Sequence, residues 1–302
     1  TDYEAAKKQD AREGKDILMD FTGSDWCGWC IKLKKEVFSQ EAFKKEAPKH
    51  FVLLELDYPR TKQLAPALKA QNEKLRIEFA IQGYPTIMLT DATGKAYART
   101  GYQAGGPESY IKHLAEKAKV RKERDKNFAA AEKAKDNAEK AKLLDLALSK
   151  IEEGGIPVLS NYGATVEQII KFDSDDKAGL KSKYEGLKNK KLARVFLGEL
   201  NQKINTKKFA EAIKDADAYL ARKGIGKEIK QQVAYSKSYA QYNLKDLKGA
   251  IATLEVALAF DPESRVGKQI PGLIKRLSDQ VNEKSPEKPG PVPAKKDEKK
   301  TK

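Results

Sequence analysis

Residues 20–30 read Asp-Phe-Thr-Gly-Ser-Asp-Trp-Cys-Gly-Trp-Cys and directly follow an apolar run at residues 17–19. The cysteines of this stretch, Cys27 and Cys30, are the only two in the 302-residue chain. A structural disulfide framework joins segments that lie far apart in the sequence. Two cysteines three positions apart serve no such purpose, so the pair exists for its own chemistry or for a metal.

The C-x-x-C spacing has a specific chemical meaning when it opens a helix. We expect a lysine-rich helix from about Cys27 to Phe38. Unpaired backbone N–H groups and the helix dipole favour an anion at its N-terminus, where Cys27 lies. The attacking species in disulfide exchange is the thiolate. Cys27 is therefore the expected nucleophile, and Cys30, one turn further on, is the expected resolving thiol.

The competing interpretation of the cysteine pair is half of a zinc site. Such a site needs two more ligands. The chain has no further cysteine, and its two histidines, His50 and His113, stand in unrelated segments without paired spacing. We therefore predict no metal and no cofactor.

The apolar runs predict a compact α/β domain over residues 1–122. Helices and strands are expected in the order α-β-α-β-α-β-β-α. A T-x-x-E capping box at Thr1 and Glu4 opens the first helix, which should end near Gly14. The expected strands occupy residues 17–21, 51–56, 86–89 and 95–99. The strand–helix–strand unit at the start implies parallel pairing in a sheet covered on both faces.

Residues 123–283 carry no convincing strand and predict a helical domain. Good helix formers dominate residues 127–151 in particular. Residues 284–302 are rich in Lys, Pro, Glu and Asp with almost no large apolar residue. Such a tail buries too little surface to offset its ordering entropy, so we predict that it is disordered.

The helical domain contains a weak internal repeat. Residues 208–213 are echoed by residues 246–251, and Ala250, Leu254 and Ala257 follow at the spacing of one helix face. This second copy resembles a tetratricopeptide repeat. Tyr219 stands in the first copy where the second has Ala257, so an irregular array of helical hairpins is the alternative.

The chain carries a formal net charge of +15. Its lysines are spread along helices that also carry many Glu and Asp, and no nucleic-acid recognition motif interrupts them. The charge therefore indicates a solvated surface rather than a nucleic-acid partner. No apolar run approaches the roughly 20 residues that a membrane span requires.

Residues 20–30 resemble the active-site stretch of the thioredoxin family, Asp-Phe-x(4)-Trp-Cys-Gly-x-Cys after an apolar strand. Gly-Tyr-Pro-Thr at residues 83–86 resembles the family's cis-proline loop, and its sequence is close to that found in protein disulfide isomerases. The resemblance covers about residues 10–120. The long double helix after the motif, with Val-Phe-Ser at residues 37–39, is most similar to envelope-type thioredoxin-like proteins related to the C-terminal domain of the transmembrane reductase DsbD.

The resemblance implies roles for the residues around the cysteines. Asp20 matches the buried carboxylate that exchanges a proton with Cys30. Pro85 would follow a cis peptide bond and pack against the disulfide, and Tyr84 would offer its backbone to an extended substrate segment. Trp26 would form a wall of the site.

The chain also departs from the family pattern. One extra residue separates Asp20 from the motif compared with thioredoxin itself. Leu53 stands where thioredoxin carries a lysine near that carboxylate. Trp29 replaces the usual Pro or His between the cysteines, and we assign it with Trp26 to substrate binding.

These observations predict a thiol–disulfide oxidoreductase that reduces or isomerises protein disulfides. The family resemblance and the non-Met start place it in the periplasm or among secreted proteins. Its expected partners are protein substrates and an upstream redox protein, with a protein partner or a second copy at the helical domain. The alternative is a helical binding scaffold whose thioredoxin-like domain only senses redox state.

Overall fold

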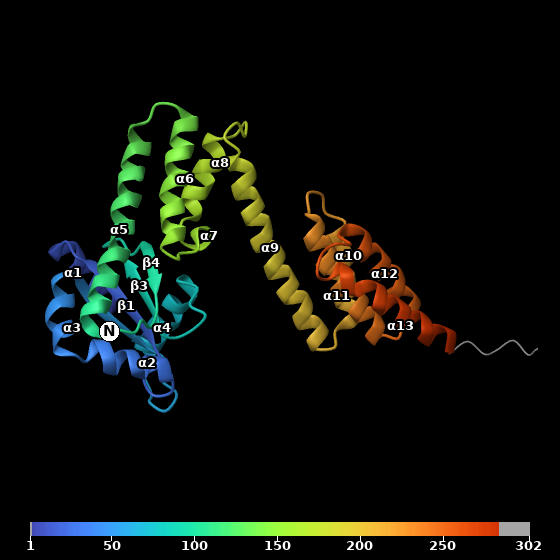
Figure 1. Ribbon diagram of the computed structural model, residues 1–302, viewed down its shortest axis with the longest axis horizontal. Coiled ribbons are helices and arrows are strands. Elements are labelled where there is room, and N and C mark those ends of the chain that lie inside the picture. Colours follow the sequence, from blue (N-terminus) through green and yellow to red (C-terminus); the bar gives the residue numbers. More distant parts are fainter. Residues whose placement is uncertain (1, 284–302) are drawn as a thin grey trace, which may run out of the picture. The chain divides into compact units, whose positions relative to one another are not determined.

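The computed structural model describes residues 2–283 and divides into two compact units, Thr1–Lys188 and Asn189–Lys302 (Figure 1). We call them unit 1 and unit 2. The expected tail, residues 284–302, lies outside the described residues, and so does Thr1. Among the described helices, none combines the length and apolar character that crossing a bilayer requires.

Unit 1 contains a four-stranded mixed sheet in the order β2-β1-β3-β4. Its strands are β1 (Asp16–Thr22), β2 (Phe51–Asp57), β3 (Thr86–Thr90) and β4 (Ala96–Thr100). β1 pairs with β2 in parallel, whereas the β1–β3 and β3–β4 pairs are antiparallel. Every residue of β1 is buried because the strand is central and helices cover both faces of the sheet (Figure 1). The predicted α/β fold is confirmed.

One face of the sheet is covered by α1 (Tyr3–Glu13) and α4 (Pro66–Glu78). The ring of Phe79, at the end of α4, lies 6.4 Å from that of Tyr3 and 6.1 Å from that of Phe21 on β1. These edge-to-face contacts join both helices to the central strand.

The other face is covered by helices that follow the cysteine motif and by α5. Their bounds are α2 (Gly28–Leu33), a π-helical turn (Lys34–Phe38), α3 (Glu41–Glu46), a 3-10 turn (Ala47–Lys49) and α5 (Gly106–Lys133). The rings of Phe38 and Phe43 lie 4.8 Å apart, and Tyr110 of α5 meets Phe38 at 5.8 Å. The helix expected from Cys27 to Phe38 is therefore present as α2 and its π-helical continuation.

Helix α1 ends as predicted but is capped by a different residue from the one expected. The Asp2 carboxylate accepts a hydrogen bond from the Ala5 backbone N–H at 2.9 Å. At the other end, Gly14 adopts φ 66°, a left-handed conformation that favours glycine. Aspartate caps helices as well as threonine does, so Asp2 takes the position that the capping-box pattern assigned to Thr1.

The structural units divide at a different place from the expected boundary between residues 122 and 123. That boundary falls inside α5, whose second half packs into the same hydrophobic core as the sheet. The core continues through α6 (Asn137–Glu153), α7 (Val158–Asn161) and α8 (Gly163–Phe172). The change in composition after Val120 marks the end of the strands but not the end of the core.

Close backbone contact explains why the helices after α5 stay with the sheet. The Arg99 N–H on β4 donates to the Gly154 carbonyl at 2.7 Å. A Cβ at Gly154 would lie 2.3 Å from the Tyr97 carbonyl oxygen, so only glycine permits this approach.

The helical run expected over residues 127–151 is interrupted before α6, which Asp136 caps by accepting from the Glu139 N–H.

Unit 2 is a row of helices in which neighbours along the sequence pack together. Their bounds are α9 (Leu180–Asn205, which begins in unit 1), α10 (Phe209–Leu220), α11 (Lys227–Asn243), α12 (Leu247–Phe260), a 3-10 turn (Gly267–Gln269) and α13 (Ile270–Glu283). Ala250, Leu254 and Ala257 are all buried in one cluster, as their spacing predicted. Tyr219 is accommodated by stacking on Phe196 at 4.0 Å. The tetratricopeptide assignment stays a prediction.

Candidate active site

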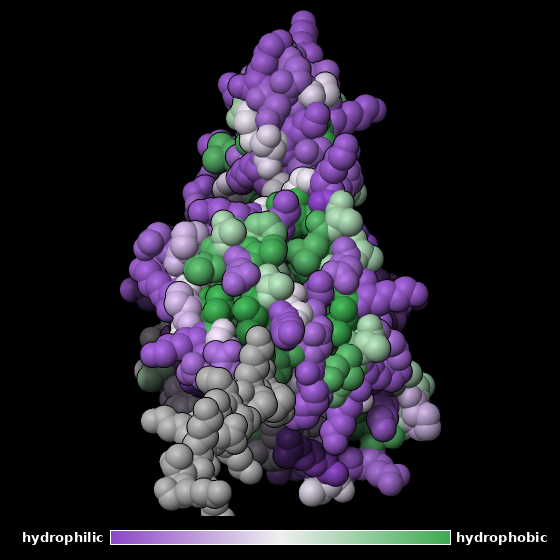
Figure 2. All heavy atoms as spheres, turned by 90° about the vertical axis from the view of Figure 1, so that its right-hand side faces the viewer, coloured by the Kyte–Doolittle hydropathy of each residue, from purple (hydrophilic) through white to green (hydrophobic). Residues whose placement is uncertain are grey.

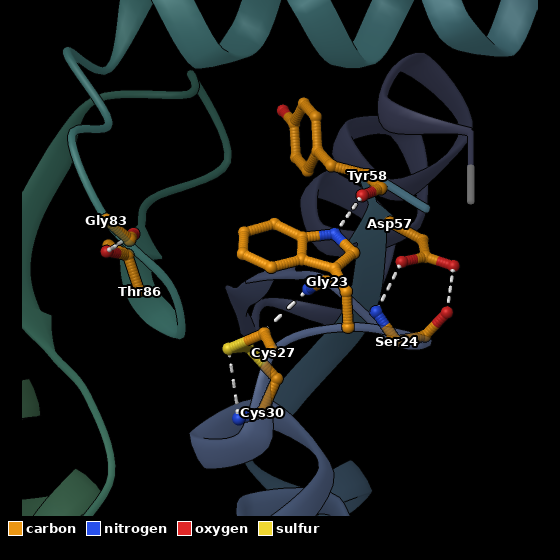
Figure 3. Close-up of a disulfide and its surroundings, with 9 residues drawn as sticks. Gly23, Ser24, Cys27, Cys30, Asp57, Tyr58, Gly83 and Thr86 are labelled. Carbon is orange, nitrogen blue, oxygen red and sulfur yellow. Dashed lines mark hydrogen bonds between the residues drawn. A yellow bond between two sulfur atoms is a disulfide. The ribbon is translucent and has the colours of Figure 1, made fainter. Parts of the chain in front are cut away.

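Cys27 and Cys30 are joined by a disulfide bond at the start of α2 (Figure 3). Cys27 is the N-cap residue, and its sulfur accepts a hydrogen bond from the Cys30 backbone N–H at 3.2 Å. Cys27 is 7% exposed and Cys30 only 3%. The unpaired N–H groups of the first helical turn thus lie where a Cys27 thiolate would form on reduction, and they would stabilise its charge.

Gly23 brings the preceding loop against the disulfide. Its backbone N–H donates to the Cys30 sulfur at 3.5 Å. A Cβ at this position would lie 2.6 Å from the indole of Trp26, so a larger residue would displace the ring. The sequence analysis did not single out Gly23, although a glycine between a buried strand and the motif is a signal of close approach.

Three aromatic rings form one wall of the site. The Trp26 indole N–H donates to the Tyr58 carbonyl at 2.8 Å. The ring of Tyr84 lies 5.6 Å from that of Trp26 and 5.2 Å from that of Tyr58. The peptide bond between Tyr84 and Pro85 is cis, as the resemblance implied. The structure therefore places Trp26 beside the cis-proline loop, and it adds Tyr58, which no motif indicated.

The cis-proline loop is held by its own hydrogen bond. The Thr86 hydroxyl donates to the Gly83 carbonyl at 2.8 Å (Figure 3). Ser24 makes a comparable connection on the other loop, donating through its N–H and its hydroxyl to the Asp57 carboxylate at 2.9 and 2.6 Å. Both loops of the site are thus tied to the ends of strands.

Trp29, between the two cysteines, is 58% exposed. Its ring lies 5.1 Å from that of Tyr102, and the Lys32 ammonium lies 5.2 Å from the Trp29 ring centroid. The Tyr102 hydroxyl donates to the Glu36 carboxylate at 2.6 Å, which orders the cluster. Trp29 therefore presents an exposed apolar ring between the two disulfide-bonded cysteines, and its contacts with Tyr102 and Lys32 hold that ring in place.

Asp20 is a buried carboxylate on the central strand, as the resemblance implied. One of its oxygens has no hydrogen-bond partner, and the side chain lines a cavity of about 170 Å³ together with Phe38 and Glu55. Burial raises the pKa of Asp20 to about 7, and the charge of Glu55 adds to the rise. A carboxyl group in this environment can take up and release a proton near neutral pH.

Glu55 is a neighbour of Asp20 that the sequence analysis missed. The two residues lie opposite each other in the parallel β1–β2 pair. The Lys34 ammonium lies 3.3 Å from the Glu55 carboxylate and partly offsets the rise in the Asp20 pKa. Residues two apart share a face of a strand, so the position of Leu53 near the carboxylate already pointed to Glu55. The positive charge that acts on Asp20 thus comes from Lys34, on the π-helical turn after α2.

Asp20 should make stability fall as pH rises. Its pKa of about 7 in the folded protein exceeds the value of about 3.9 expected in the unfolded chain. The folded state therefore binds more protons between these values, and the free energy of unfolding decreases from about pH 4 to pH 7. Asp20→Asn removes this titration, so the Tm of the variant minus that of the wild type should rise by about 3 °C or more between pH 4 and pH 8.

Thermal unfolding followed by circular dichroism measures this difference. Glu41→Gln, at an exposed carboxylate on α3, is the matched control and should show no such trend. A Tm difference between Asp20→Asn and wild type that stays constant with pH would show that Asp20 titrates as in the unfolded chain.

Residues 3–118 match the family described as a thioredoxin-like domain, and the chain belongs to this family of thiol–disulfide oxidoreductases. The chain is 32% identical over 119 residues to the disulfide bond reductase DsbH of Chlamydia pneumoniae, a match that covers 39% of this chain and 72% of the relative. It is 30% identical over 92 residues to the thiol:disulfide interchange protein DsbD of Actinobacillus pleuropneumoniae serotype 5b (strain L20), covering 30% of this chain and 14% of that protein. A solved structure described as DsbH oxidoreductase is 31% identical, covers 38% of this chain and 81% of its own, and has a TM-score of 0.37.

Proposed function

We propose that the protein reduces or isomerises disulfide bonds of other proteins, with Cys27 as nucleophile and Cys30 as resolving thiol. The observation that carries this proposal is the position of the Cys27 sulfur at the N-terminus of α2, where it accepts from the Cys30 N–H. The name of the Chlamydia pneumoniae relative, a disulfide bond reductase, supports reduction as the direction.

The exchange has two steps. In the reduced enzyme the Cys27 thiolate attacks one sulfur of the client disulfide, forms a mixed disulfide and releases one client thiolate. The Cys30 thiolate then attacks the Cys27 sulfur and releases the second client sulfur. The client gains two electrons and two protons while Cys27 and Cys30 become the disulfide. An upstream dithiol protein must return two electrons and two protons for the next cycle.

Asp20 is proposed to take the proton of the Cys30 thiol in the second step. Cys30 is 3% exposed, so bulk water reaches its thiol poorly. A buried carboxylate with a pKa of about 7 can accept that proton and pass it on, and the cavity it lines extends to the exposed Glu55.

The client segment is proposed to lie across the two loops of the site. Tyr84 offers backbone groups next to the cis bond to Pro85, which suits an extended chain. Trp26 and Trp29 would contact the apolar side chains beside the client cysteines. The resemblance to envelope proteins supports a location in the periplasm or outside the cell.

Unit 2 is proposed to position a protein partner, and a second copy of the chain is the other outcome to test. A groove of about 280 Å³ on unit 2 is lined mainly by tyrosines and leucines, together with one arginine and two uncharged polar residues, namely Tyr235, Tyr239, Tyr242, Leu254, Leu273, Leu277, Arg276, Ser238 and Gln280. Figure 2 shows hydrophobic side chains gathered at the surface among hydrophilic ones. Tyrosine and arginine are among the residues enriched at the energetically dominant positions of protein interfaces. The rival function, a binding scaffold with a redox sensor, rests on this groove.

Reduction of insulin by the full chain tests both proposals. The wild type with an excess of dithiothreitol should accelerate insulin precipitation severalfold over dithiothreitol alone. Tyr239→Ser, at a 55% exposed residue of the groove, should slow reduction of insulin or another protein client by about threefold or more. Reduction of a short disulfide peptide should stay at the wild-type rate.

Val256→Ser is the matched control, because Val256 is similarly exposed on α12 but does not line the groove. If the wild type does not accelerate insulin precipitation, the proposed oxidoreductase function is rejected and the rival function, a binding scaffold, remains. Equal effects of both variants would reject the groove, and a dimer seen by light scattering that Tyr239→Ser dissociates would assign the groove to a second copy.

A further inference from the structure

We propose that a cationic cleft beside Trp26 binds acidic side chains of the client segment next to its disulfide, so that the enzyme selects disulfides flanked by Asp or Glu. This inference rests on the proposed function and names its substrate class. The cleft has a volume of about 690 Å³ and lies between the loop after β2 and the start of α4. Its lining includes Tyr58, Arg60, Lys62, Lys69 and Asn72.

The loop that forms the cleft is fastened to the active-site loop. The Asp25 carboxylate accepts from the backbone N–H groups of Arg60 and Thr61 at 2.9 and 2.7 Å, and also from the Thr61 hydroxyl. These hydrogen bonds hold the pKa of Asp25 well below its usual range. Asp25 stands two residues before Cys27, so a ligand held by the cleft is held in a defined position relative to the nucleophile.

Arg60 connects the cleft directly to the wall of the active site. Its guanidinium carbon lies 4.0 Å from the centroid of the Trp26 ring, a cation–π contact. The Trp26 indole in turn donates to the Tyr58 carbonyl. Tyr58 and Arg60, which line the cleft, therefore both contact Trp26 of the aromatic wall.

Hydrogen bonds between the end of β2 and α4 hold the floor of the cleft. Asn72 is 2% exposed, and its side-chain amide donates to the Asp57 carbonyl at 2.9 Å. The Tyr58 hydroxyl donates to the Asn72 carbonyl at 2.5 Å. These bonds join the end of β2 to α4, so the cleft is present before any ligand binds.

The charges that line the cleft leave a positive excess. Within residues 2–283, no carboxylate lies at ion-pair distance from Arg60, Lys62 or Lys69. Three cations thus face two carboxylates in the lining, Asp57 and Glu73, and the charge of Glu73 is balanced by Arg76 outside the lining. Glu73 is held by Arg76 through contacts of 2.9 and 2.6 Å, and Asp57 accepts both hydrogen bonds from Ser24. A client carboxylate is the ligand that such a cleft attracts.

The geometry of the cis-proline loop directs a client toward the cleft. The Tyr84 ring, beside the backbone that would pair with the client, lies 5.2 Å from the ring of Tyr58, which lines the cleft. Successive side chains of an extended segment point to opposite sides. A client residue on the side of Tyr58 would therefore meet the cleft that Arg60 and Lys62 line.

Three disulfide-cyclised peptides test this inference with the full-length reduced protein. They are identical except that the residue two positions from one cysteine is Glu, Gln or Lys. We expect the wild type at low salt to reduce the Glu peptide with a kcat/KM about fivefold or more above that of the Lys peptide, mainly through KM. The preference should shrink in 0.5 M NaCl because salt screens exposed charges.

The double variant Lys62→Glu/Lys69→Glu should reverse the preference, so that the Lys peptide becomes the better substrate. Lys74→Glu, on α4 but outside the cleft lining, changes the total charge without changing the cleft and should keep the wild-type preference. Equal kcat/KM for all three peptides, or an unchanged preference in the double variant, would overturn the cleft. Failure of the wild type to reduce even the Gln peptide would instead overturn the proposed function, and the role of the cleft with it.

Discussion

Cys27→Ser should abolish disulfide exchange, whereas Cys30→Ser should leave a protein that attacks a client disulfide once and then stays bound to it. The Cys27 sulfur lies at the N-terminus of α2 and is the more exposed of the two. A serine hydroxyl there is not ionised and does not displace a sulfur, so the rate should fall by about 10³-fold or more. Without Cys30 the mixed disulfide through Cys27 has no internal thiol to resolve it.

Client trapping measures the second half of this prediction. After reaction with cell extract, Cys30→Ser should carry protein adducts on a non-reducing gel, and mass spectrometry should locate them at Cys27. Cys27→Ser should carry far fewer. In the reduced wild type, iodoacetamide at neutral pH should alkylate Cys27 first, because the helix N-terminus lowers its pKa below the free-thiol value of about 8.5. Equal alkylation rates would contradict the assignment of roles. Faster alkylation of Cys30, or adducts on Cys27→Ser in place of Cys30→Ser, would exchange the two roles.

Arg124→Met should destabilise unit 1 by about 3–5 kcal/mol, because it leaves a buried carboxylate without its cation. Arg124 is 4% exposed, and its guanidinium lies 2.7 Å from the Asp91 carboxylate. It also donates to the Tyr162 hydroxyl at 3.0 Å, and that hydroxyl donates to the Ala96 carbonyl at 2.6 Å. The network joins α5, the β3–β4 hairpin and the start of α8.

Urea unfolding of the full chain measures the loss, with the transition of unit 1 followed through Trp26 and Trp29 fluorescence. Lys150→Met is the matched control, since it breaks an exposed ion pair with Glu153 on α6 and should change the free energy of unfolding by less than about 0.5 kcal/mol. Arg124→Met combined with Asp91→Asn should recover part of the stability. A loss below about 1 kcal/mol for Arg124→Met alone would mean that the network is not needed to hold the helices on the sheet.

This network also shows why the boundary expected at residues 122 and 123 could not be located from the sequence. Lysine-rich, alanine-rich helix composition begins near that point, and composition of this kind is typical of solvated helices. From the sequence alone, Arg124 is expected to be one more solvent-exposed cation in this lysine-rich segment. Its burial depends on Asp91 and Tyr162, which lie 33 and 38 residues away in the chain. Local patterns carry no information on such pairings, so the sequence indicates where the strands end but not how far the hydrophobic core of unit 1 continues.

The strands of the sheet and the reactive disulfide were predictable because each depends on residues close together in the chain. Alternating burial and apolar runs specify strands, and the C-x-x-C spacing places one sulfur at a helix N-terminus whatever surrounds it. The burial of Asp20 was implied by the family resemblance and agrees with its place in the apolar strand expected over residues 17–21. The sequence by itself therefore determined the fold class of unit 1, the exchange chemistry and the pair of atoms that performs it.

Only the tertiary structure decided what surrounds that pair. Glu55 and Lys34 reach Asp20 from a neighbouring strand and from the helix above it. Asp25 fastens a loop 35 residues further along the chain, and Arg60 thereby comes to lie on Trp26. Such contacts arise when distant segments pack, and their partners are fixed by the shape of the folded chain rather than by spacing along it. The reactive cysteine pair is thus specified by residues close together in the sequence. The groups around Asp20 and the cleft beside Trp26 depend on the packing of distant segments.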